Sequence, residues 1–562
     1  MASFQIVTAR GHRYLRIVES FRDPVTKRPK LRVLRHLGRA DDALATLAQA
    51  EHVAVASHTH GSVAAVWHLA QSLDLAALID AHVPPGPALH DGLTVGQSLT
   101  LAVVGRACQA TSTRGFAAWA ATTTLGSLAG VDVTRLTSQH FWDQMHRVPI
   151  TAVAAIETAL VARVLAGFDI AVDTVLYDAT NFFTVLATTN ARAALPARGH
   201  NTQKRHDLRH VGVALCCTRG GAGVPAIPLF HQVYGGARPD VRVFADVLPQ
   251  LRERVVALGG DDARLTIVYD KGNVARHTQA TVDDAPFHYV AALTAASQRT
   301  LMAEATPALT PCVLSPDETV AVYRTRRVVW GVERTLIVLV SPRLQQGQRR
   351  GIEQHLAKAV AWLDQLQALL ARGQQRRSRA TLEAEIAACL RGQHLRAILA
   401  VQLVGTGRSL TLTYTIEHAA LDRLEHEWLG RLVLMTDQHA WSTAEIIGAY
   451  RGQSVVEGVF RTLKDPRRLA LRPQYYWTDH KLHLHAWLCV TASLLATLVH
   501  HTAVRDADCA GSVATLFTEL AHIRRATIAR PTTGRGARQT QQLETPTPLQ
   551  TRLIAALGIP TT

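Results

Sequence analysis

Two apolar stretches that each end in an aspartate constrain the fold of this 562-residue chain more than any other feature. The runs TVLYD and RLTIVYD place Asp178 and Asp270 directly after β-branched residues, and the polar turns ATN and KGN follow. Short runs of this kind, bounded by turn formers, predict strands. Similar runs occur nearby (VGVALCC, AIPLFHQVY and FHYVAAL), and a helical pattern, DVRVFADVLPQLRERVVAL, separates two of them. We therefore predict a mixed α/β domain with a largely buried sheet.

The positions of these aspartates make them candidate functional residues. Ligand and catalytic groups collect at the carboxyl ends of strands in open α/β sheets. Aspartate also often begins a turn, and this structural interpretation stays open for either residue alone. Asp173 lies an odd number of residues from Asp178, so a regular strand directs the two side chains to opposite faces.

A third candidate lies in the stretch WSTAEIIGAYRGQSVVEGVFRTLKDP. Ser442 and Glu445 have the spacing of a capping box, which predicts a helix start at Ser442, and the Asp-Pro pair at 465–466 ends the helix. At about 100° per residue, polar and apolar side chains fall on different sides. The polar line contains Tyr450, Gln453, Glu457, Arg461 and Lys464, and the apolar side contains Val455, Val456, Val459, Phe460 and Leu463. Glu457 can thus face a site, although a solvated helix face with Glu–Arg pairs is the alternative.

Together, Asp178, Asp270 and Glu457 predict a metal site with two Mg²⁺ ions, with Mn²⁺ as a possible substitute, because hard cations prefer carboxylate oxygens. Two ions about 3.5–4 Å apart activate the attacking oxygen and stabilise the leaving oxygen in phosphodiester cleavage. The chain has 60 Lys and Arg against 44 Asp and Glu, a net charge of +16, which favours a polyanionic partner such as nucleic acid.

These residues and several further motifs resemble the DDE transposases of bacterial insertion sequences, most closely the sixteen-thirty-four-like branch of the insertion-sequence-four superfamily. The family pattern is Tyr, two residues, Arg, three residues, Glu, six residues, Lys. Tyr450, Glu457 and Lys464 match it, whereas Gln453 stands at the arginine position, so Arg451 or Arg461 would have to replace that contact to the DNA backbone. The other motifs are LYDATNFF, VYDKGNVARH, RGHNTQKRHDLRHVGVAL, RPDVRVF, LRPQYYWTDHKLHLHAWL and TPLQTRLIAALGI.

The resemblance implies an RNase H-like core with Asp178, Asp270 and Glu457 as catalytic metal ligands. It also implies binding of double-stranded DNA at terminal inverted repeats and at a target, metal-dependent nicking, and strand transfer. Tyr450, Arg451, Gln453, Arg461 and Lys464 are the expected DNA-binding residues, and we expect a homodimer in the DNA complex. The alternatives are an RNase H-like endonuclease without strand transfer and a transposase-derived DNA-binding protein that has lost its chemistry.

Changes in sequence character divide the chain into six regions, with an insertion inside the α/β core. They are a β-hairpin region (1–44), a helical and DNA-binding region (45–168), the first part of the core (169–300), the insertion (301–429), the second part of the core (430–500) and a basic C-terminal arm (501–562).

The cysteines and the hydropathy of the sequence indicate in which cellular compartment the protein is expected. The seven cysteines include no C-x-x-C pair, which favours reduced thiols rather than disulfides or a zinc site. The apolar run at 487–499 is shorter than the roughly 20 residues of a membrane span. We therefore expect no membrane partner and a cytoplasmic, nucleoid-associated protein.

Overall fold

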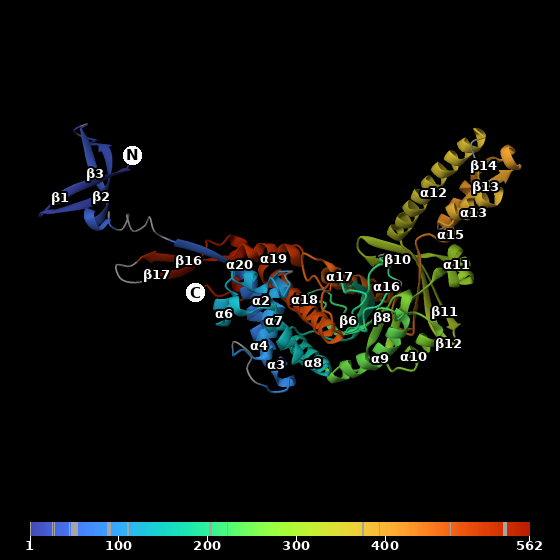
Figure 1. Ribbon diagram of the computed structural model, residues 1–562, viewed down its shortest axis with the longest axis horizontal. Coiled ribbons are helices and arrows are strands. Elements are labelled where there is room, and N and C mark those ends of the chain that lie inside the picture. Colours follow the sequence, from blue (N-terminus) through green and yellow to red (C-terminus); the bar gives the residue numbers. More distant parts are fainter. Residues whose placement is uncertain are drawn as a thin grey trace. The chain divides into compact units, whose positions relative to one another are not determined.

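The computed structural model describes residues 2–561 apart from 25, 27, 44, 46–53, 87–91, 110–111, 200, 202–204, 222, 374–375, 393, 473 and 532–536. The chain divides into two compact units. Unit 1 contains Met1–Arg147 and Leu495–Thr562, and unit 2 contains Val148–Leu494. The mixed α/β class predicted from the sequence is confirmed (Figure 1).

Unit 1 begins with a three-stranded antiparallel sheet. Its order is β1 (Ala2–Ala9), β2 (His12–Arg22) and β3 (Pro29–Arg39). The sequence predicts a hairpin here, and the structure adds β1 because residues 2–9 pair along their whole length with β2. Gly11, with φ of +75°, makes the tight turn between β1 and β2, a conformation that glycine adopts without steric cost.

The rest of unit 1 is helical, with a second sheet formed by distant parts of the chain. Strand β4 (Ala54–Thr59) pairs antiparallel with β16 (Arg524–Pro531), which also pairs with β17 (Ala537–Leu543). Figure 1 draws β16 and β17 in red beside the blue β4. The helices are α2 (Gly61–Ser72), α3 (Leu75–His82), α4 (Val95–Cys108), α5 (Phe116–Ala120), α6 (Leu125–Ala129), α7 (Ser138–His146), α19 (Val513–Ala521) and α20 (Pro548–Ala556), with a 3-10 turn η1 (Val133–Arg135).

The predicted C-terminal arm at 501–562 therefore contains regular elements, namely α19, β16, β17 and α20. Residues 532–536 of this region lie outside the described part of the chain.

Unit 2 is built on one nine-stranded sheet of order β10-β11-β12-β15-β9-β8-β5-β6-β7. Strands β5, β8 and β9 are parallel to one another, and the other neighbouring pairs are antiparallel. The strands are β5 (Thr174–Phe183), β6 (His210–Thr218), β7 (Pro228–Gly235), β8 (Thr266–Tyr269), β9 (His288–Leu293), β10 (Thr310–Ser315), β11 (Glu318–Val329), β12 (Val332–Val340) and β15 (Arg431–Thr436).

Helices and short turns connect these strands. They are α8 (Ile150–Gly167), α9 (Asp240–Ala257), α10 (Arg276–Asp283), α11 (Arg299–Ala305), α16 (Thr443–Arg451) and α17 (Gln453–Lys464), with η2 (Lys271–Asn273), η3 (Ala295–Ser297) and η4 (Thr306–Ala308). The long helix α18 (Asp479–Ala507) begins in unit 2 and ends in unit 1.

A buried ion cluster joins α8, β7 and α9. Glu157 accepts hydrogen bonds from His231 Nδ1 at 2.6 Å and from Arg254 Nη1 at 3.2 Å. All three side chains are 5–8% exposed. Arg254 also donates to the carbonyls of Leu229 and Ala154, so its charge is well paired.

An inserted segment lies between β12 and β15. It contains α12 (Pro342–Ala371), α13 (Arg379–Cys389), α14 (Leu395–Ile398), β13 (Leu399–Val404), a turn η5 (Gly407–Ser409), β14 (Thr411–Ile416) and α15 (His418–Glu427). Leu363, Leu366 and Leu382 belong to a separate apolar core of this segment. The sequence places the start of the insertion at residue 301, whereas β10, β11 and β12 extend the main sheet, so the chain leaves the sheet only after β12.

Two described helices, α8 and α18, are long and apolar enough to cross a membrane by length and composition, and the bent pair α2 and α3 would add a third span. In α18, 89% of the apolar window is buried within the protein, against 33% in α8. The apolar run at 487–499 is therefore part of a 29-residue helix, longer than the sequence indicates, because its polar flanks continue the same helix. The absence of a membrane partner stays a prediction.

Candidate active site

Asp178 and Asp270 lie at the same level and on the same face of the sheet, although only Asp270 follows the end of its strand. The sequence predicts that a strand ends at Asp178, whereas β5 continues to Phe183 because residues 178–183 pair with β6. The two strands pair in parallel register up to Tyr177 and Tyr269, so each aspartate lies one residue beyond a register pair. Both tyrosine rings lie 4.6 Å from the ring of Phe244 on α9. Because successive side chains alternate, the aspartates point to the opposite face, away from α9. The backbone of Asp270 is extended (φ −82°, ψ 163°), so the alternation continues through it.

Helices α16 and α17 pack on the face to which the aspartates point. The predicted capping box is confirmed: Ser442 Oγ accepts from the Glu445 N–H at 3.2 Å, and Glu445 Oε2 accepts from the Ser442 N–H at 2.7 Å. The predicted single helix is interrupted at Gly452. A Cβ at Gly452 would lie 3.0 Å from Leu176 Cδ2 on β5, so glycine permits this close approach of helix and sheet.

The apolar side of α17 is buried at three of its five predicted positions, and the predicted polar line is exposed at Glu457 and Arg461 but not at Gln453. Val456, Phe460 and Leu463 are 0–3% exposed and form the buried side. The rings of Phe460 and Phe182 lie 6.3 Å apart, which ties α17 to β5. Glu457 is on the exposed side of the helix.

The sequence predicts that Gln453 binds DNA, but the structure buries this side chain against the sheet. It is 8% exposed, and its Nε2 donates to the carbonyl of Val268 at 2.7 Å and to that of Tyr177 at 3.2 Å. Tyr177 directly precedes Asp178 on β5, and Val268 lies two residues before Asp270 on β8. The amide therefore holds the first turn of α17 against the sheet instead of reaching the surface.

The three carboxylates influence one another electrostatically. The pKa of Asp178 rises from its ordinary 3.8 to about 7, mainly because the carboxyl is buried, and the negative charges of Glu457 and Asp270 raise it further. A hydrogen bond from the Ala179 N–H and the charge of Lys464 act in the opposite direction. The carboxylates that the sequence analysis grouped are therefore close enough to couple.

Tyr450 and Lys464 contact the strands that carry the aspartates. The Tyr450 hydroxyl donates to Asp270 Oδ1 at 2.7 Å, and burial followed by the Asp270 charge raises the pKa of this phenol. Lys464 Nζ donates to the hydroxyl of Thr180 and lies 5.6 Å from the centre of the Phe182 ring. Burial lowers the pKa of Lys464, as expected for a partly desolvated ammonium.

Asp178 and Glu457 line one open cleft of about 460 Å³. Its other lining residues are Thr180, Phe460, Arg461, Lys464, Asp465, Pro466 and Arg472. Asp270 is not among them, and its Oδ1 accepts the hydrogen bond from the Tyr450 hydroxyl. Within the described part of the chain, no three His, Cys, Asp or Glu side chains form a group that could hold a metal ion.

Arg451 and Arg461 differ in their surroundings. Arg451 forms a two-fold ion pair with Glu318 on β11, with N–O distances of 2.6 and 2.7 Å, and both side chains are 40–46% exposed. Arg461 is exposed on the cleft. Of the two predicted substitutes for the missing arginine, Arg461 is the one beside the carboxylates.

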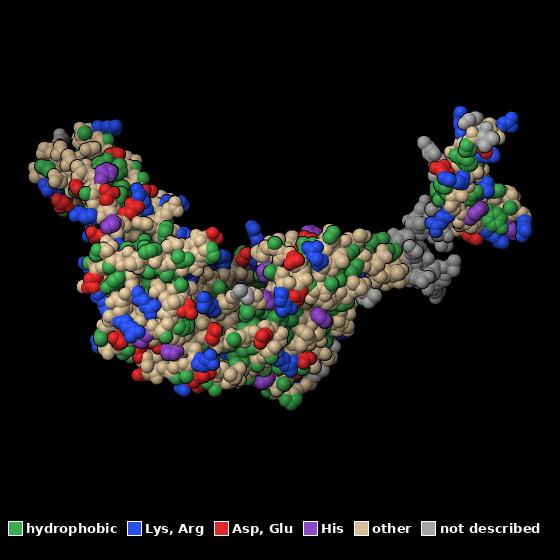
Figure 2. Space-filling view, turned by 180° about the vertical axis from the view of Figure 1, so that it is seen from behind, with side chains coloured by type: hydrophobic (Ala, Val, Ile, Leu, Met, Phe, Trp, Pro, Cys, Tyr) green, Lys and Arg blue, Asp and Glu red, His purple; other side chains and the backbone are tan. Residues whose placement is uncertain are grey.

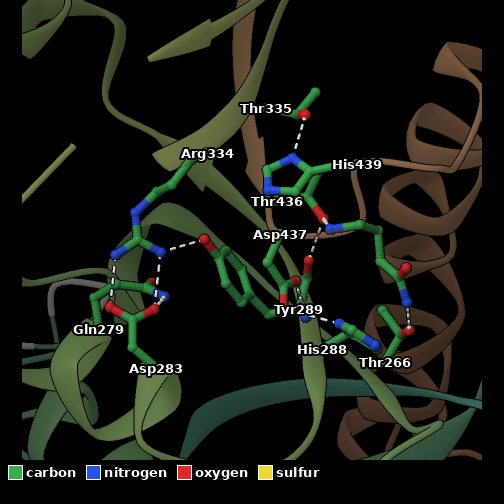
Figure 3. Close-up of polar contacts among 11 residues, drawn as sticks. Thr266, Gln279, Asp283, His288, Tyr289, Arg334, Thr335, Thr436, Asp437 and His439 are labelled. Carbon is green, nitrogen blue, oxygen red and sulfur yellow. Dashed lines mark hydrogen bonds and ion pairs between the residues drawn. The ribbon is translucent and has the colours of Figure 1, made fainter. Parts of the chain in front are cut away.

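A polar network that the sequence analysis missed lies at the opposite end of the sheet (Figure 3). Asp437 directly follows β15 and accepts hydrogen bonds from the Tyr289 N–H at 3.0 Å and from His288 Nδ1 at 2.9 Å. Nearby, buried Arg334 donates to both carboxylate oxygens of Asp283 at 2.8 and 2.6 Å. The run RLVLMTD carries the same strand-end aspartate signal as the catalytic candidates, but β15 runs antiparallel to β9, so Asp437 ends at the other edge.

Residues 4–57 match the family model for the N-terminal domain of IS1634 family transposases, which confirms the predicted resemblance to insertion-sequence transposases of that branch. The match does not extend to the cleft. No curated protein matches the chain. One similar solved structure is the cryo-EM structure of a piggyBac transposase synaptic complex with hairpin DNA, at 10% sequence identity and a TM-score of 0.37, covering 81% of this chain and 79% of that one. Of the RGHNTQKRHD motif, residues 200 and 202–204 lie outside the described part of the chain.

Proposed function

We propose that this chain, which carries the N-terminal domain of IS1634 family transposases, is a DDE transposase that binds the terminal inverted repeats of its insertion sequence and catalyses metal-dependent DNA nicking and strand transfer. The observation that carries the proposal is the electrostatic coupling of Asp178 with both Glu457 and Asp270 at one end of the sheet. Perturbed carboxylates beside a cleft are typical of catalytic sites.

The strand order supports an RNase H-like core as part of this proposal. From β7 through β6 to β5 the neighbours are antiparallel, and from β5 through β8 to β9 they are parallel. This order brings two acid-bearing strands side by side in the centre, with the helix of the third acid packed across them. Along the sequence, the insertion between β12 and β15 separates the strands that carry Asp178 and Asp270 from helix α17, which carries Glu457.

The donor chemistry suits divalent cations, although among the described residues the carboxylates do not form a ready-made ion-binding group. Three carboxylates would supply the hard oxygen ligands that Mg²⁺ prefers, and a bound cation would lower the pKa of Asp178, which is raised mainly by burial and further by Glu457 and Asp270. Asp178, Asp270 and Glu457 would hold two Mg²⁺ ions, with Mn²⁺ as a possible substitute. When bound, the ions supply activation of the attacking oxygen and stabilisation of the leaving oxygen.

Other residues of the chain would orient the carboxylates and contact the DNA. Tyr450 orients Asp270 through its hydroxyl hydrogen bond. Lys464 and Arg461 bring positive charge to the cleft, where they would contact DNA phosphates. Deprotonation of Asp178 above about pH 7 would prepare it as a ligand. We further propose that the helical region at 45–168 contacts DNA and that two copies act together in the complex.

A cleavage assay on duplexes that carry the inverted repeats flanking the gene tests the catalytic residues. Asp178→Asn, Asp270→Asn and Glu457→Gln should each abolish Mg²⁺-dependent cutting while DNA binding persists. Asp437→Asn is the matched control, because it changes a strand-end aspartate at the other edge and should leave cutting intact. Cutting at the wild-type rate by any of the three acid variants would refute the assignment, and cutting without joining to a target duplex would identify a nuclease instead.

A further inference from the structure

The hairpin formed by β11 and β12 exposes three large apolar side chains where the chain turns. Val328, Trp330 and Val332 are 71%, 38% and 40% exposed, and we call them the hairpin tip. Val329 pairs with Val332, so the turn itself consists of Trp330 and Gly331. Apolar side chains gathered at one exposed place commonly mark a surface that another molecule covers.

The backbone of this turn is strained where it presents Trp330. Trp330 and Gly331 both have positive φ angles, of 55° and 91°. Two-residue hairpin turns with this backbone favour asparagine, aspartate or glycine, because a bulky side chain is disfavoured at positive φ. Strain of this kind is concentrated at functional positions. The hairpin therefore carries a tryptophan at a position where a smaller residue would fit the backbone better.

An apolar groove of about 600 Å³ lies close to this hairpin. Residues of α9 and residues around the end of α10 line it, among them Val256, which is 53% exposed, and the buried Phe287. Arg334 connects the hairpin to α10, because it donates to the carbonyl of Val329 at 3.1 Å and to both carboxylate oxygens of Asp283 (Figure 3). The hairpin tip and the α9–α10 groove are thus neighbours within unit 2.

The hairpin and the groove carry opposite charges. Residues 324–334 contain four arginines and one glutamate, and Arg326 is exposed and forms no ion pair within the described residues. Glu253 and Asp284 line the groove, are exposed and have no ion-pair partner in the part of the chain that the structure describes. Arg252, which also lines the groove, is already in an ion pair. The groove is therefore acidic where the hairpin is basic.

We propose that the hairpin tip of one copy of this chain inserts into the α9–α10 groove of a second copy, which returns the same contact. A tip and a groove that are neighbours on one protomer allow this reciprocal contact about a two-fold axis, the commonest symmetry of homodimers. Trp330 would be the anchor, because buried tryptophans dominate interface energetics. Arg326 would lie against Glu253 and Asp284. The inference rests on the proposed function only for the expectation that two copies act together, and it names the surface that joins them.

Charge and position favour a second copy over DNA as the occupant of the groove. Glu253 and Asp284 would repel phosphates. Figure 2 shows acidic as well as basic side chains over unit 2, so no single-sign field opposes the approach of a second copy. The groove lies on the α9 side of the sheet, where the Tyr269 hydroxyl donates to a residue of α10. Because Asp178 and Asp270 point to the opposite face, a dimer formed here leaves the cleft open.

Sedimentation velocity of the full chain without DNA, over a range of protein concentrations, measures the proposed self-association. Trp330→Gly should raise the dimer dissociation constant by roughly 30-fold, as expected for the loss of an interface hot spot. Glycine adopts positive φ without strain, so this variant should stay folded, which circular dichroism verifies. Val328→Ser should also weaken the dimer. Val404→Ser is its matched control, because it changes an exposed valine of the insertion, outside both surfaces, and should leave the dissociation constant unchanged.

A charge exchange tests whether the hairpin of one copy meets the groove of the other. Arg326→Glu and Glu253→Arg should each weaken the dimer by roughly tenfold, because each places like charges together. The double variant should recover most of the wild-type affinity, since opposite charges face each other again. A purely structural role of either residue would not produce this recovery.

The possible failures are distinguishable. A chain that stays monomeric at every concentration, with and without a DNA duplex, would overturn the inference, and so would a dimer that Trp330→Gly leaves unchanged. Reduced DNA affinity of Trp330→Gly with unchanged self-association would assign the hairpin tip to DNA instead. Each of these results would leave the proposed function intact if the chain still cuts inverted-repeat duplexes. A dimer that depends on Trp330, in a chain that cuts no DNA, would overturn the proposed function and support this inference.

Discussion

Replacement of Asp178 by asparagine should stabilise the protein in alkaline, metal-free solution while it removes a proposed catalytic ligand. The carboxyl is partly buried near two other acids, and its pKa rises to about 7. Asparagine has nearly the same shape and can still accept the hydrogen bond from the Ala179 N–H, which is 2.8 Å from Asp178 Oδ1. The substitution therefore removes the charge with little change in packing.

The magnitude follows from the difference between folded and unfolded pKa values. Because folding raises the pKa of Asp178 from 3.8 to about 7, the folded state holds the proton more tightly, and wild-type stability falls as the pH rises through this interval. A shift of about three pKa units corresponds to about 4 kcal/mol. Asp178→Asn should thus exceed the wild type by about 4 kcal/mol at pH 8 and by less than about 2 kcal/mol at pH 5.

Calorimetric unfolding in EDTA at several pH values between 5 and 8 measures this difference. The transition of unit 2 is the relevant one, since it contains Asp178. Asp173→Asn is the control: it changes an exposed aspartate just before the same strand and should give no pH-dependent gain. Added Mg²⁺ should stabilise the wild type at pH 8 and the variant much less, because the variant lacks a proposed ligand.

A stability difference that is constant between pH 5 and pH 8 would refute the reasoning. It would mean that Asp178 has an ordinary pKa, and so that neither burial nor the neighbouring acids act on it as inferred. An equal gain in Asp173→Asn would attribute the effect to net charge rather than to the site.

Three further outcomes test the elements around the cleft. Gln453→Leu should lower the free energy of unfolding of unit 2 by about 1–3 kcal/mol for each carbonyl left unpaired, as measured by urea denaturation, and unchanged stability would remove its anchoring role. Lys464→Ala should weaken DNA binding and lower the salt slope by about 0.9, whereas Lys358→Ala on the insertion should leave it unchanged; equal slopes would exclude Lys464 as a phosphate contact. Glu157→Ala should lower the free energy of unfolding of unit 2 by about 3–5 kcal/mol in the same urea denaturation, because it leaves Arg254 buried without its carboxylate. A loss below about 1 kcal/mol would show that Arg254 is stabilised without Glu157.

Local signals predicted the helical part of the site well. The capping box at Ser442, the Asp-Pro stop and the apolar side of α17 all depend on residues within a few positions of one another, so the sequence contains the necessary information. The interruption at Gly452 was not predicted, although glycine lowers helix propensity. Its close approach to Leu176 on β5 is a contact that the local sequence does not contain. The role of Gln453 was missed for the same reason: its partners are carbonyls on strands 185 and 276 positions away.

The sequence by itself shows three aspartates, Asp178, Asp270 and Asp437, each directly after an apolar run, and it places Glu457 away from the apolar side of its helix. It did not show that the strand of Asp178 continues to Phe183. It could not distinguish among these aspartates, because a strand-end signal carries no information about strand direction. Only the tertiary structure decided this: β5 and β8 run parallel and bring Asp178 and Asp270 together, whereas the antiparallel β15 carries Asp437 to the other edge. Chain direction within a sheet is set by pairing between distant segments, and it is this pairing that turns separate acidic residues into one electrostatically coupled site.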